Sequence, residues 1–126
     1  MTFLPEQDRR YLEEKGIAYH EHVQGGQKAI VFPNKELPPE IFQIASSDIL
    51  VLLPPGYDDV GPDMFFAHPP IKLIQNGQSP SKTNATYDFL GKSWQRWSRH
   101  NNEWRHGIDG IWTVIKRIDR ALREAN

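Results

Sequence analysis

The sequence predicts an α+β fold, with one helix near each end of the chain and antiparallel strands between them. An amphipathic helix pattern fills the C-terminal segment, and apolar residues alternate on both sides of a Gly-Gly turn near the N-terminus. The chain has 126 residues, of which 38% are hydrophobic, so it can form a core of its own. We therefore expect a single domain over residues 1–126.

The N-terminal helix is indicated by the residues at its two ends. Pro5 suits the first turn of a helix, and the carboxylates of Glu6 and Asp8 suit the positive end of the helix dipole. Gly16 is typical of the position that follows a helix, so we expect the helix to end near Lys15.

A hairpin is predicted after this helix. Residues 17–23 alternate in the manner of a half-buried strand, Gly25-Gly26 provides a turn, and residues 28–32 form the returning strand.

Two further segments complete the predicted sheet. Residues 48–53, DILVLL, are continuously apolar, which is typical of a buried central strand. A short strand is expected at 63–67, between prolines that the interior of a sheet does not accept. Residues 41–44 fit either a short strand or a turn of helix. We therefore expect an antiparallel sheet of about four strands.

The C-terminal helix has the clearest pattern in the sequence. Its apolar residues recur at spacings of three and four, which places them on one face. They are Ile108, Ile111, Trp112, Ile115, Ile118 and Leu122. Basic residues occupy the other face and favour the negative C-terminal end of the helix. We expect the apolar face to pack on the sheet.

Composition argues against several classes of function. The chain has no cysteine, which excludes disulfides, thiolate zinc sites and a cysteine nucleophile. Its formal net charge is −1, whereas general nucleic-acid binders carry a basic excess. His20 and His22 share a strand face without a third ligand in register, and no phosphate loop or dinucleotide fingerprint occurs, so we expect no metal and no cofactor. The N-terminus lacks the apolar region of a signal peptide, and no apolar run could span a bilayer, so we expect a cytoplasmic protein.

Residues 93–104, SWQRWSRHNNEW, combine three tryptophans with arginines and a histidine. Three interpretations fit: an aromatic cap on the core, a protein-binding surface, or a platform for single-stranded nucleic acid. The candidate binding residues are Trp94, Arg96, Trp97, Arg99, Trp104 and Arg105. We expect a helical turn that places Trp94 and Trp97 on one face, and Arg96 and Arg99 on another. The second face would present guanidinium groups to a partner's carboxylates.

Residues 53–70, LPPGYDDVGPDMFFAHPP, are similar to the third and fourth strands of the ubiquitin-conjugating (UBC) fold, where His-Pro-Asn ends a strand. His68-Pro69-Pro70 takes the place of that tripeptide. The PDMFF, WQRWSRH and GIDG segments resemble the prokaryotic UBC-like family E, which accompanies multi-ubiquitin-like proteins, activating-enzyme homologues and JAB-type peptidases in bacterial gene clusters. The resemblance implies a UBC-like fold with an N-terminal helix, an antiparallel sheet, an irregular active-site-like loop and a C-terminal helix. It implies a ubiquitin-like protein and an activating-enzyme homologue as partners.

Two departures from the family pattern bear on function. A UBC enzyme carries ubiquitin as a thioester on a cysteine between its His-Pro-Asn and its tryptophan, but no cysteine lies between His68 and Trp104. Pro70 stands where the asparagine would stabilise an oxyanion. The sequence therefore favours a cysteine-less binding protein that recognises a ubiquitin-like protein or its activating enzyme, rather than a thioester-forming enzyme.

The alternative is an enzyme that uses Ser98 and His100, with His68, for acyl transfer or hydrolysis without a thioester. A weaker alternative is a module that binds single-stranded nucleic acid. The family position that His68 resembles is structural. We expect His68-Pro69-Pro70 beside the tryptophan-rich segment, where a UBC active-site cleft would be. We also expect Trp104 to be largely buried, since it resembles the tryptophan that precedes the following helix.

Overall fold

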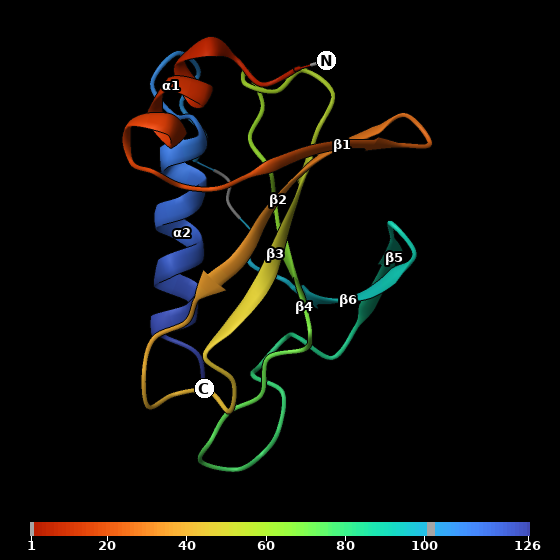
Figure 1. Ribbon diagram of the computed structural model, residues 1–126, viewed down its shortest axis with the longest axis vertical. Helices are drawn as coiled ribbons and strands as arrows, with labels where there is room; N and C mark the ends of the chain where they lie inside the picture. The colour runs from red at the N-terminus through yellow and green to blue at the C-terminus, as the bar shows by residue number, and fades with distance from the viewer. Residues whose placement is uncertain (1, 101–102) are drawn as a thin grey trace.

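The computed structural model describes residues 2–100 and 103–126, and this part of the chain contains two helices and six strands (Figure 1). The helices are α1, Glu6–Glu14, and α2, Ile111–Arg123. The strands are β1, His20–Gln24; β2, Gln27–Glu36; β3, Ser46–Leu53; β4, Phe65–His68; β5, Thr86–Phe89; and β6, Lys92–Trp97. The fold is α+β, as the sequence predicts.

The N-terminal elements follow their local sequence signals. α1 lies within the predicted helix, and Gly16 beyond its end has a positive φ of 66°. Gly25 and Gly26 also have positive φ values, 58° and 81°, and they connect β1 to β2 as a two-residue turn. The predicted hairpin is therefore confirmed, although β2 is longer than expected. Glycine accepts this backbone conformation without the steric penalty of a Cβ.

The strands form one antiparallel sheet in the order β1-β2-β3-β4-β6-β5. β3 lies between β2 and β4, which confirms that residues 48–53 belong to a central strand. Within the described residues, 41–44 contribute a single isolated bridge, from Phe42 to Leu73.

The prediction of about four strands is wrong, because it omitted the β5–β6 hairpin. Leu90 and Gly91 connect these strands as a two-residue turn with φ values of 53° and 73°. A leucine with positive φ is uncommon, so this turn lacks the usual Asn-Gly or Asp-Gly signal. The stretch 93–104 consequently begins as a strand rather than a helical turn. Asn101 and Asn102, within the same stretch, lie outside the described residues.

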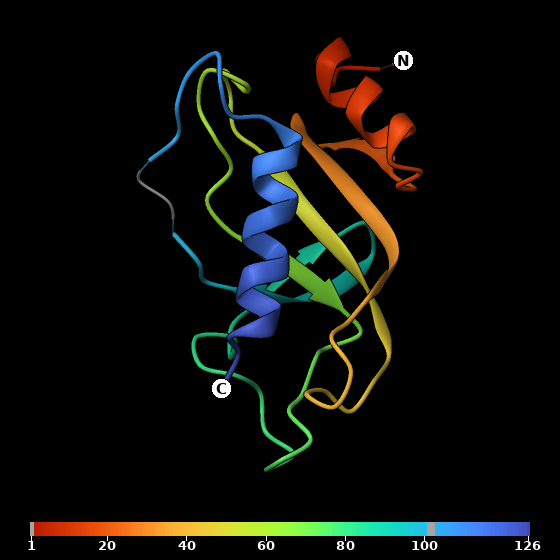
Figure 2. The same ribbon diagram turned by 90° about the vertical axis from the view of Figure 1, so that its left-hand side faces the viewer.

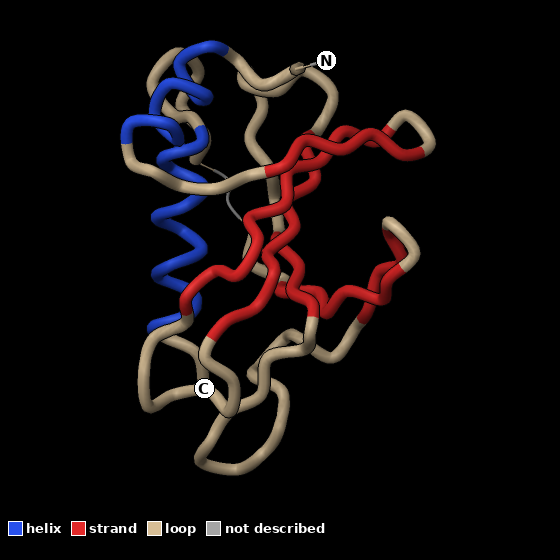
Figure 3. The backbone as a smooth tube through the Cα atoms, in the orientation of Figure 1, coloured by secondary structure: helices blue, strands red, loops and turns tan. Residues whose placement is uncertain are grey.

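The sheet is curled, and α2 lies against one of its faces (Figures 1 and 2). On the opposite side, the tips of the β1–β2 and β5–β6 hairpins extend in the same direction (Figure 3). The backbone N–H of Leu90 donates to Oε1 of Gln24 at 3.1 Å, which connects the two tips. The core is correspondingly divided into a large cluster under α2 and a smaller one inside the curl.

α2 begins later than its apolar pattern predicts. The fully buried face of the helix consists of Ile111, Val114, Ile118 and Leu122, while Ile115 is partly buried. Ile108 lies in the turn before the helix and is 59% exposed, so its predicted place in the stripe is wrong. The reason is the intervening backbone: Gly107 has a φ of 80° and Gly110 is extended, so neither continues a helix.

Asp8 connects α1 to the start of α2. Its buried carboxylate accepts hydrogen bonds from the Tyr57 hydroxyl at 2.6 Å and from the backbone N–H of Ile111 at 3.4 Å. Burial raises the pKa of Asp8 above its ordinary value, and the two hydrogen bonds oppose this rise. Burial and the neighbouring Asp8 carboxylate also raise the pKa of Tyr57. Through this one carboxylate, α1 is attached to α2 and to the proline-rich segment 54–63, which contains Tyr57.

Candidate functional site

Trp94 and Trp97 lie on opposite faces of β6. Side chains alternate along a strand, so residues three apart point in opposite directions. Trp94 packs inside the curl, where its Nε1 donates to the Phe89 carbonyl at 2.9 Å. Trp97 packs under α2, with its ring stacked on Phe65 at 5.2 Å. The expectation that Trp94 and Trp97 lie on one face is therefore wrong. Both rings are buried, 1% and 0% exposed, and they support the two cores rather than present a surface.

The same alternation separates two arginines that we expected on one face. Arg96 shares the face of Trp94, and its Nε is buried without a hydrogen-bond partner among the described residues. Arg99 follows β6 and lies over the Trp97 ring at 5.0 Å, where it donates to the Ser98 carbonyl. The expectation of a common cationic face is therefore wrong, because β6 is a strand.

Gln95 is an important residue that the sequence did not suggest. It is buried, and its carboxamide pairs with the backbone of Ile71 in both directions, at 2.8 and 3.0 Å. Its Oε1 also accepts a hydrogen bond from Nε1 of Trp97 at 3.0 Å. The segment after His68-Pro69-Pro70 is thus attached to β6. The available signal was a polar residue on the same strand face as a buried tryptophan.

His68 lies beside the tryptophan-rich segment, as expected. Its ring centroid is 5.8 Å from that of Trp94, and its Nδ1 is 3.2 Å from the Ser93 carbonyl oxygen. Next to it, the Pro69 carbonyl accepts a hydrogen bond from the Ser47 hydroxyl at 2.9 Å. These contacts hold the His-Pro-Pro segment against both neighbouring strands.

Ser98, His100 and His68 are not brought together as a catalytic trio. The Ser98 hydroxyl is 3.9 Å from the sulfur of Met64, just before β4, whereas His68 is the last residue of β4. His68 is four residues further along the chain than Met64, which corresponds to about 13 Å in an extended strand. His100 instead pairs with Asp63, its Nδ1 lying 2.7 Å from the carboxylate. The arrangement is thus an exposed imidazole–carboxylate pair.

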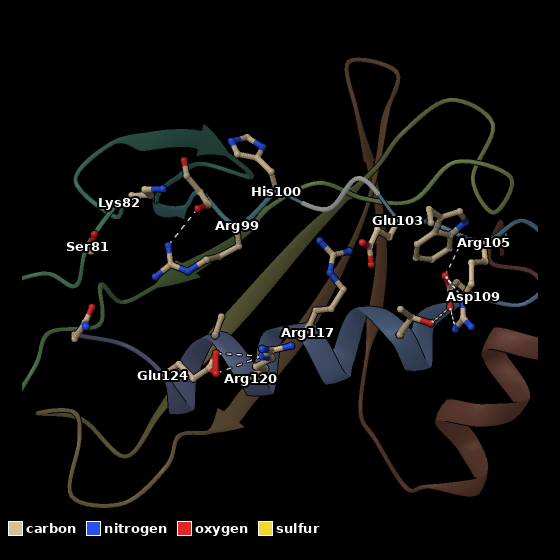
Figure 4. A pocket seen from close by; sticks show the side chains of 15 residues that line it. Ser81, Lys82, Arg99, His100, Glu103, Arg105, Asp109, Arg117, Arg120 and Glu124 are labelled. Atoms are coloured by element: carbon tan, nitrogen blue, oxygen red, sulfur yellow. Dashed lines mark hydrogen bonds and ion pairs between the residues drawn. The ribbon is translucent and has the colours of Figure 1, made fainter.

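A cavity of about 1190 Å³ opens between α2 and the chain that follows β6 (Figure 4). Its walls come from α2, from residues 81–82, and from the described residues on both sides of 101–102. Its cationic side chains are Lys82, Arg99, Arg105, Arg117 and Arg120, against the carboxylates of Glu103, Asp109 and Glu124. The cavity is thus basic on balance, although the whole chain is not.

The carboxylates at the two ends of the cavity are paired with arginines. Asp109 accepts from Arg105 at 2.8 Å, and Glu124 accepts from Arg120 at 3.2 Å (Figure 4). Hydrogen bonds from the Arg105 side chain and backbone lower the pKa of Asp109 to about 2, and the same contact raises the pKa of Arg105. Thr113 also donates to Asp109, at 3.0 Å. This carboxylate therefore holds the chain before α2 in place.

Arg99 and Arg117, in the middle of the cavity, are partly buried cations. Burial lowers the pKa of Arg99, and it lowers the pKa of Arg117 against the opposing effect of Asp63 and Asp109. The Arg117 guanidinium donates to the Pro62 carbonyl at 3.3 Å.

The outer wall of the cavity is attached to the proline-rich segment 54–63. Nε1 of Trp104 donates to the Asp58 carbonyl at 2.7 Å, and His106 lies 2.6 Å from the Asp59 carboxylate. The Trp104 ring packs directly over Gly61, where a Cβ would overlap it. Trp104 is partly buried against the core under α2, in keeping with the expectation that most of this side chain is covered.

The fold and this site define a small α+β protein with a curled antiparallel sheet, one covering helix and a basic cavity along that helix. A family model described as Prokaryotic E2 family E matches residues 4–125, and the chain belongs to this family. A comparison with curated proteins and one with solved structures each found no match.

Two further properties of the described residues concern metal ions and membranes. No group of three or more His, Asp or Glu side chains among them is placed to hold a metal ion. Neither α1 nor α2 is long and apolar enough to cross a membrane.

Proposed function

We propose that this protein is a UBC-fold member of its family that acts by binding, as a single cytoplasmic domain, a ubiquitin-like protein or its activating-enzyme homologue. The observation that carries the proposal is the absence of cysteine from all 126 residues, in a family named for conjugating enzymes. A thioester on cysteine is the intermediate of that chemistry, so the chain itself cannot form it. Pro70, in place of an asparagine, also lacks a side-chain donor for an oxyanion.

The surroundings of His68 support a structural role for the His-Pro-Pro segment. The imidazole lies between the Ser93 carbonyl and the Trp94 ring, and the next residues are bound by Ser47 and Gln95. These contacts shape the backbone.

The binding surface that we propose runs along the cavity. Arg99, Trp104 and Arg105 line it, whereas Trp94 and Trp97 support it from within the cores. A partly exposed tryptophan beside arginines is the composition found at energetically important positions of protein interfaces. Arg96 points to the other face of the sheet and is not part of this surface.

The direct test is calorimetric titration of the protein with a ubiquitin-like protein and an activating-enzyme homologue from the same genome. We expect association with at least one of them, weakened by Arg99→Gln and unchanged by Arg123→Gln. Arg123 is a matched control, because it is exposed on α2 and does not line the cavity. No association with either protein would contradict the proposal.

A second candidate is acyl transfer through Ser98 and His100. The observation that favours it is the 2.7 Å pair between His100 and Asp63, which resembles the base and orienting acid of a catalytic triad. Incubation with ATP, the activating enzyme and the ubiquitin-like protein would then leave an ester-linked adduct in an intact-mass spectrum. The adduct should be absent from Ser98→Ala. Under the binding function, the mass of the wild type stays unchanged.

A further inference from the structure

A second, smaller cavity lies between Phe3, the β1–β2 turn and the chain that leaves β3. Its volume is about 310 Å³, and among the described residues it shares no lining residue with the basic cavity along α2. We propose that this N-terminal cavity binds a small monocarboxylate with an aromatic body. The inference concerns a different surface from the proposed binding of a protein partner, and it does not depend on that function.

The walls of the N-terminal cavity are largely apolar rings. Phe3 and Tyr57 contribute aromatic rings, and Pro54 and Pro55 contribute pyrrolidine rings. Both aromatic side chains are partly buried, and each packs against the large core. Aromatic and apolar side chains predominate in sites for small ligands, because a flat apolar ligand leaves water when it packs on them. The lining therefore favours a ligand with an aromatic body.

One cation stands beside these rings. Lys28 is the charged residue among the described residues that line the N-terminal cavity, and its Nζ lies 5.5 Å from the centroid of the Phe3 ring. The ammonium group offers three donors and no acceptor. A ligand whose ring packs beside Phe3 can therefore place one anionic group at Lys28.

The carboxylates nearest to these residues in the fold have other partners. Oε1 of Glu21 accepts hydrogen bonds from the hydroxyl of Thr2 and from two backbone N–H groups of the N-terminal segment. Oδ2 of Asp58 accepts a hydrogen bond from Gln7 at 3.1 Å. Neither carboxylate lines the N-terminal cavity. The position beside Lys28 therefore suits an incoming carboxylate.

Hydrogen bonds fix three walls of the N-terminal cavity before a ligand binds. The backbone N–H of Phe3 donates to Glu21 at 3.0 Å, and the Tyr57 hydroxyl donates to Asp8 at 2.6 Å. The Gln27 carboxamide donates to one backbone carbonyl in β2 and one in β3, at 2.8 and 2.9 Å. Fixing the walls in advance reduces the conformational entropy that binding would otherwise cost.

The size of the N-terminal cavity favours a small molecule over a segment of polypeptide. Its volume of about 310 Å³ lies at the lower end of the roughly 300–1,000 Å³ that is typical of small-ligand sites. The basic cavity along α2, at about 1190 Å³, is much larger. A single ring with one carboxylate therefore matches the smaller space.

The test is a titration of isotope-labelled protein, followed by its backbone amide NMR signals, with three probes. Phenylacetate carries the ring and the charge, phenylacetamide carries the ring without the charge, and acetate carries the charge without the ring. For the wild type, we expect phenylacetate to bind at least roughly tenfold more tightly than either of the others, because it alone uses both features of the site. The amide signals of Gly26, Gln27 and Gly56 should shift.

A pair of lysine variants tests the role of the cation. Lys28→Met should bind phenylacetate no more tightly than phenylacetamide. Lys92→Met should bind phenylacetate like the wild type. Lys92 is the matched control, because it is exposed and its Nζ lies 5.9 Å from the Trp94 ring, outside the N-terminal cavity.

Several outcomes would overturn the inference. Equal binding of phenylacetate and phenylacetamide by the wild type, or amide shifts confined to α2 and the chain after β6, would exclude this carboxylate site. Tighter binding of the capped dipeptide N-acetyl-Phe-Glu-amide than of phenylacetate would assign the cavity to a polypeptide instead of a small molecule. These comparisons use the wild type, so they hold even if Lys28→Met folds poorly.

Discussion

The carboxamide of Gln95 pairs with Ile71 as a neighbouring strand would, accepting from its N–H at 2.8 Å and donating to its carbonyl at 3.0 Å. Both partners are buried, and the same Oε1 accepts the indole N–H of Trp97. One side chain therefore satisfies three buried polar groups in two segments. Gln95→Leu leaves these groups without partners, and a buried polar group without a partner costs about 1–3 kcal/mol.

We accordingly expect Gln95→Leu to lower the free energy of unfolding by about 2–5 kcal/mol in urea denaturation. Gln75→Leu is the matched control, because Gln75 is exposed in the loop that follows β4. An equal effect of the two substitutions would mean that the pairing of Gln95 with Ile71 contributes little.

Asp8→Asn should remove a pH dependence of stability. Burial raises the pKa of Asp8, so the folded chain binds this proton more tightly than the unfolded chain does. Its contribution to stability is therefore complete below about pH 4, and it is lost as pH rises through the folded-state pKa. Relative to the wild type, Asp8→Asn should gain stability between about pH 4 and pH 7 in urea titrations. Asp88→Asn, at an exposed position of β5, should show no such change. A constant difference across this range would contradict the assignment.

Ile118→Ala and Ile115→Ala should differ in their effects, although the two residues are one turn apart on α2. Ile118 is 3% exposed in the core under the helix, whereas Ile115 is only partly buried. Ile118→Ala should cost about 2–5 kcal/mol as a large-to-small change in the core. Ile115→Ala should cost less than about 2 kcal/mol, since it loses less buried area. Equal losses in thermal or urea unfolding would mean that α2 is rotated from the position described.

Gly61→Ala should displace Trp104 from the proline-rich segment. A Cβ at this position would overlap the Trp104 ring, so the ring must move and its Nε1 must give up the Asp58 carbonyl. We expect a loss of about 1–3 kcal/mol in stability and a shift of the Trp104 indole N–H signal in NMR spectra. Val60→Ala, at the exposed neighbouring position, should leave both unchanged.

Arg96→Met should be nearly neutral for stability and for partner binding. Among the described residues, the buried Nε of Arg96 has no hydrogen-bond partner, so methionine can replace the aliphatic stem without removing a satisfied polar contact there. We expect the free energy of unfolding to stay within about 1 kcal/mol of the wild type. Calorimetric titration with the partner should also be unchanged, because Arg96 lies on the sheet face away from the cavity. A marked loss of affinity would mean that the partner binds the sheet face on which Arg96 lies.

The elements predicted correctly are those with a local signal. The apolar spacing of α2, the Gly25-Gly26 turn and the continuous run in β3 each depend on a few consecutive residues. The β5–β6 hairpin was missed because Leu90 occupies a backbone conformation that leucine seldom adopts. That error then led to a wrong prediction of which side chains in residues 93–104 share a face, since a strand and a helical turn put different residues on the same face.

The candidate site was predictable only in the part that is contiguous in sequence. Arg99, Trp104 and Arg105 were among the expected binding residues, and all three line the cavity. Arg117 was assigned only to the polar face of a helix, and Lys82 belongs to a segment that carries no motif. Their approach depends on the way α2 lies across the sheet, which no local pattern specifies.

The register of β6 against β4 also bears on the order in which the sheet assembles. The β5–β6 hairpin closes through two residues, and such hairpins form in about 1–10 μs. Pairing of Phe65 with Trp97 must first close the long connection between β4 and β5, which carries a larger entropic cost. Until that step, the edge of β4 is an unpaired strand to which a second nascent chain can add. Correct folding in a crowded cell therefore depends on how quickly the hairpin docks onto β4.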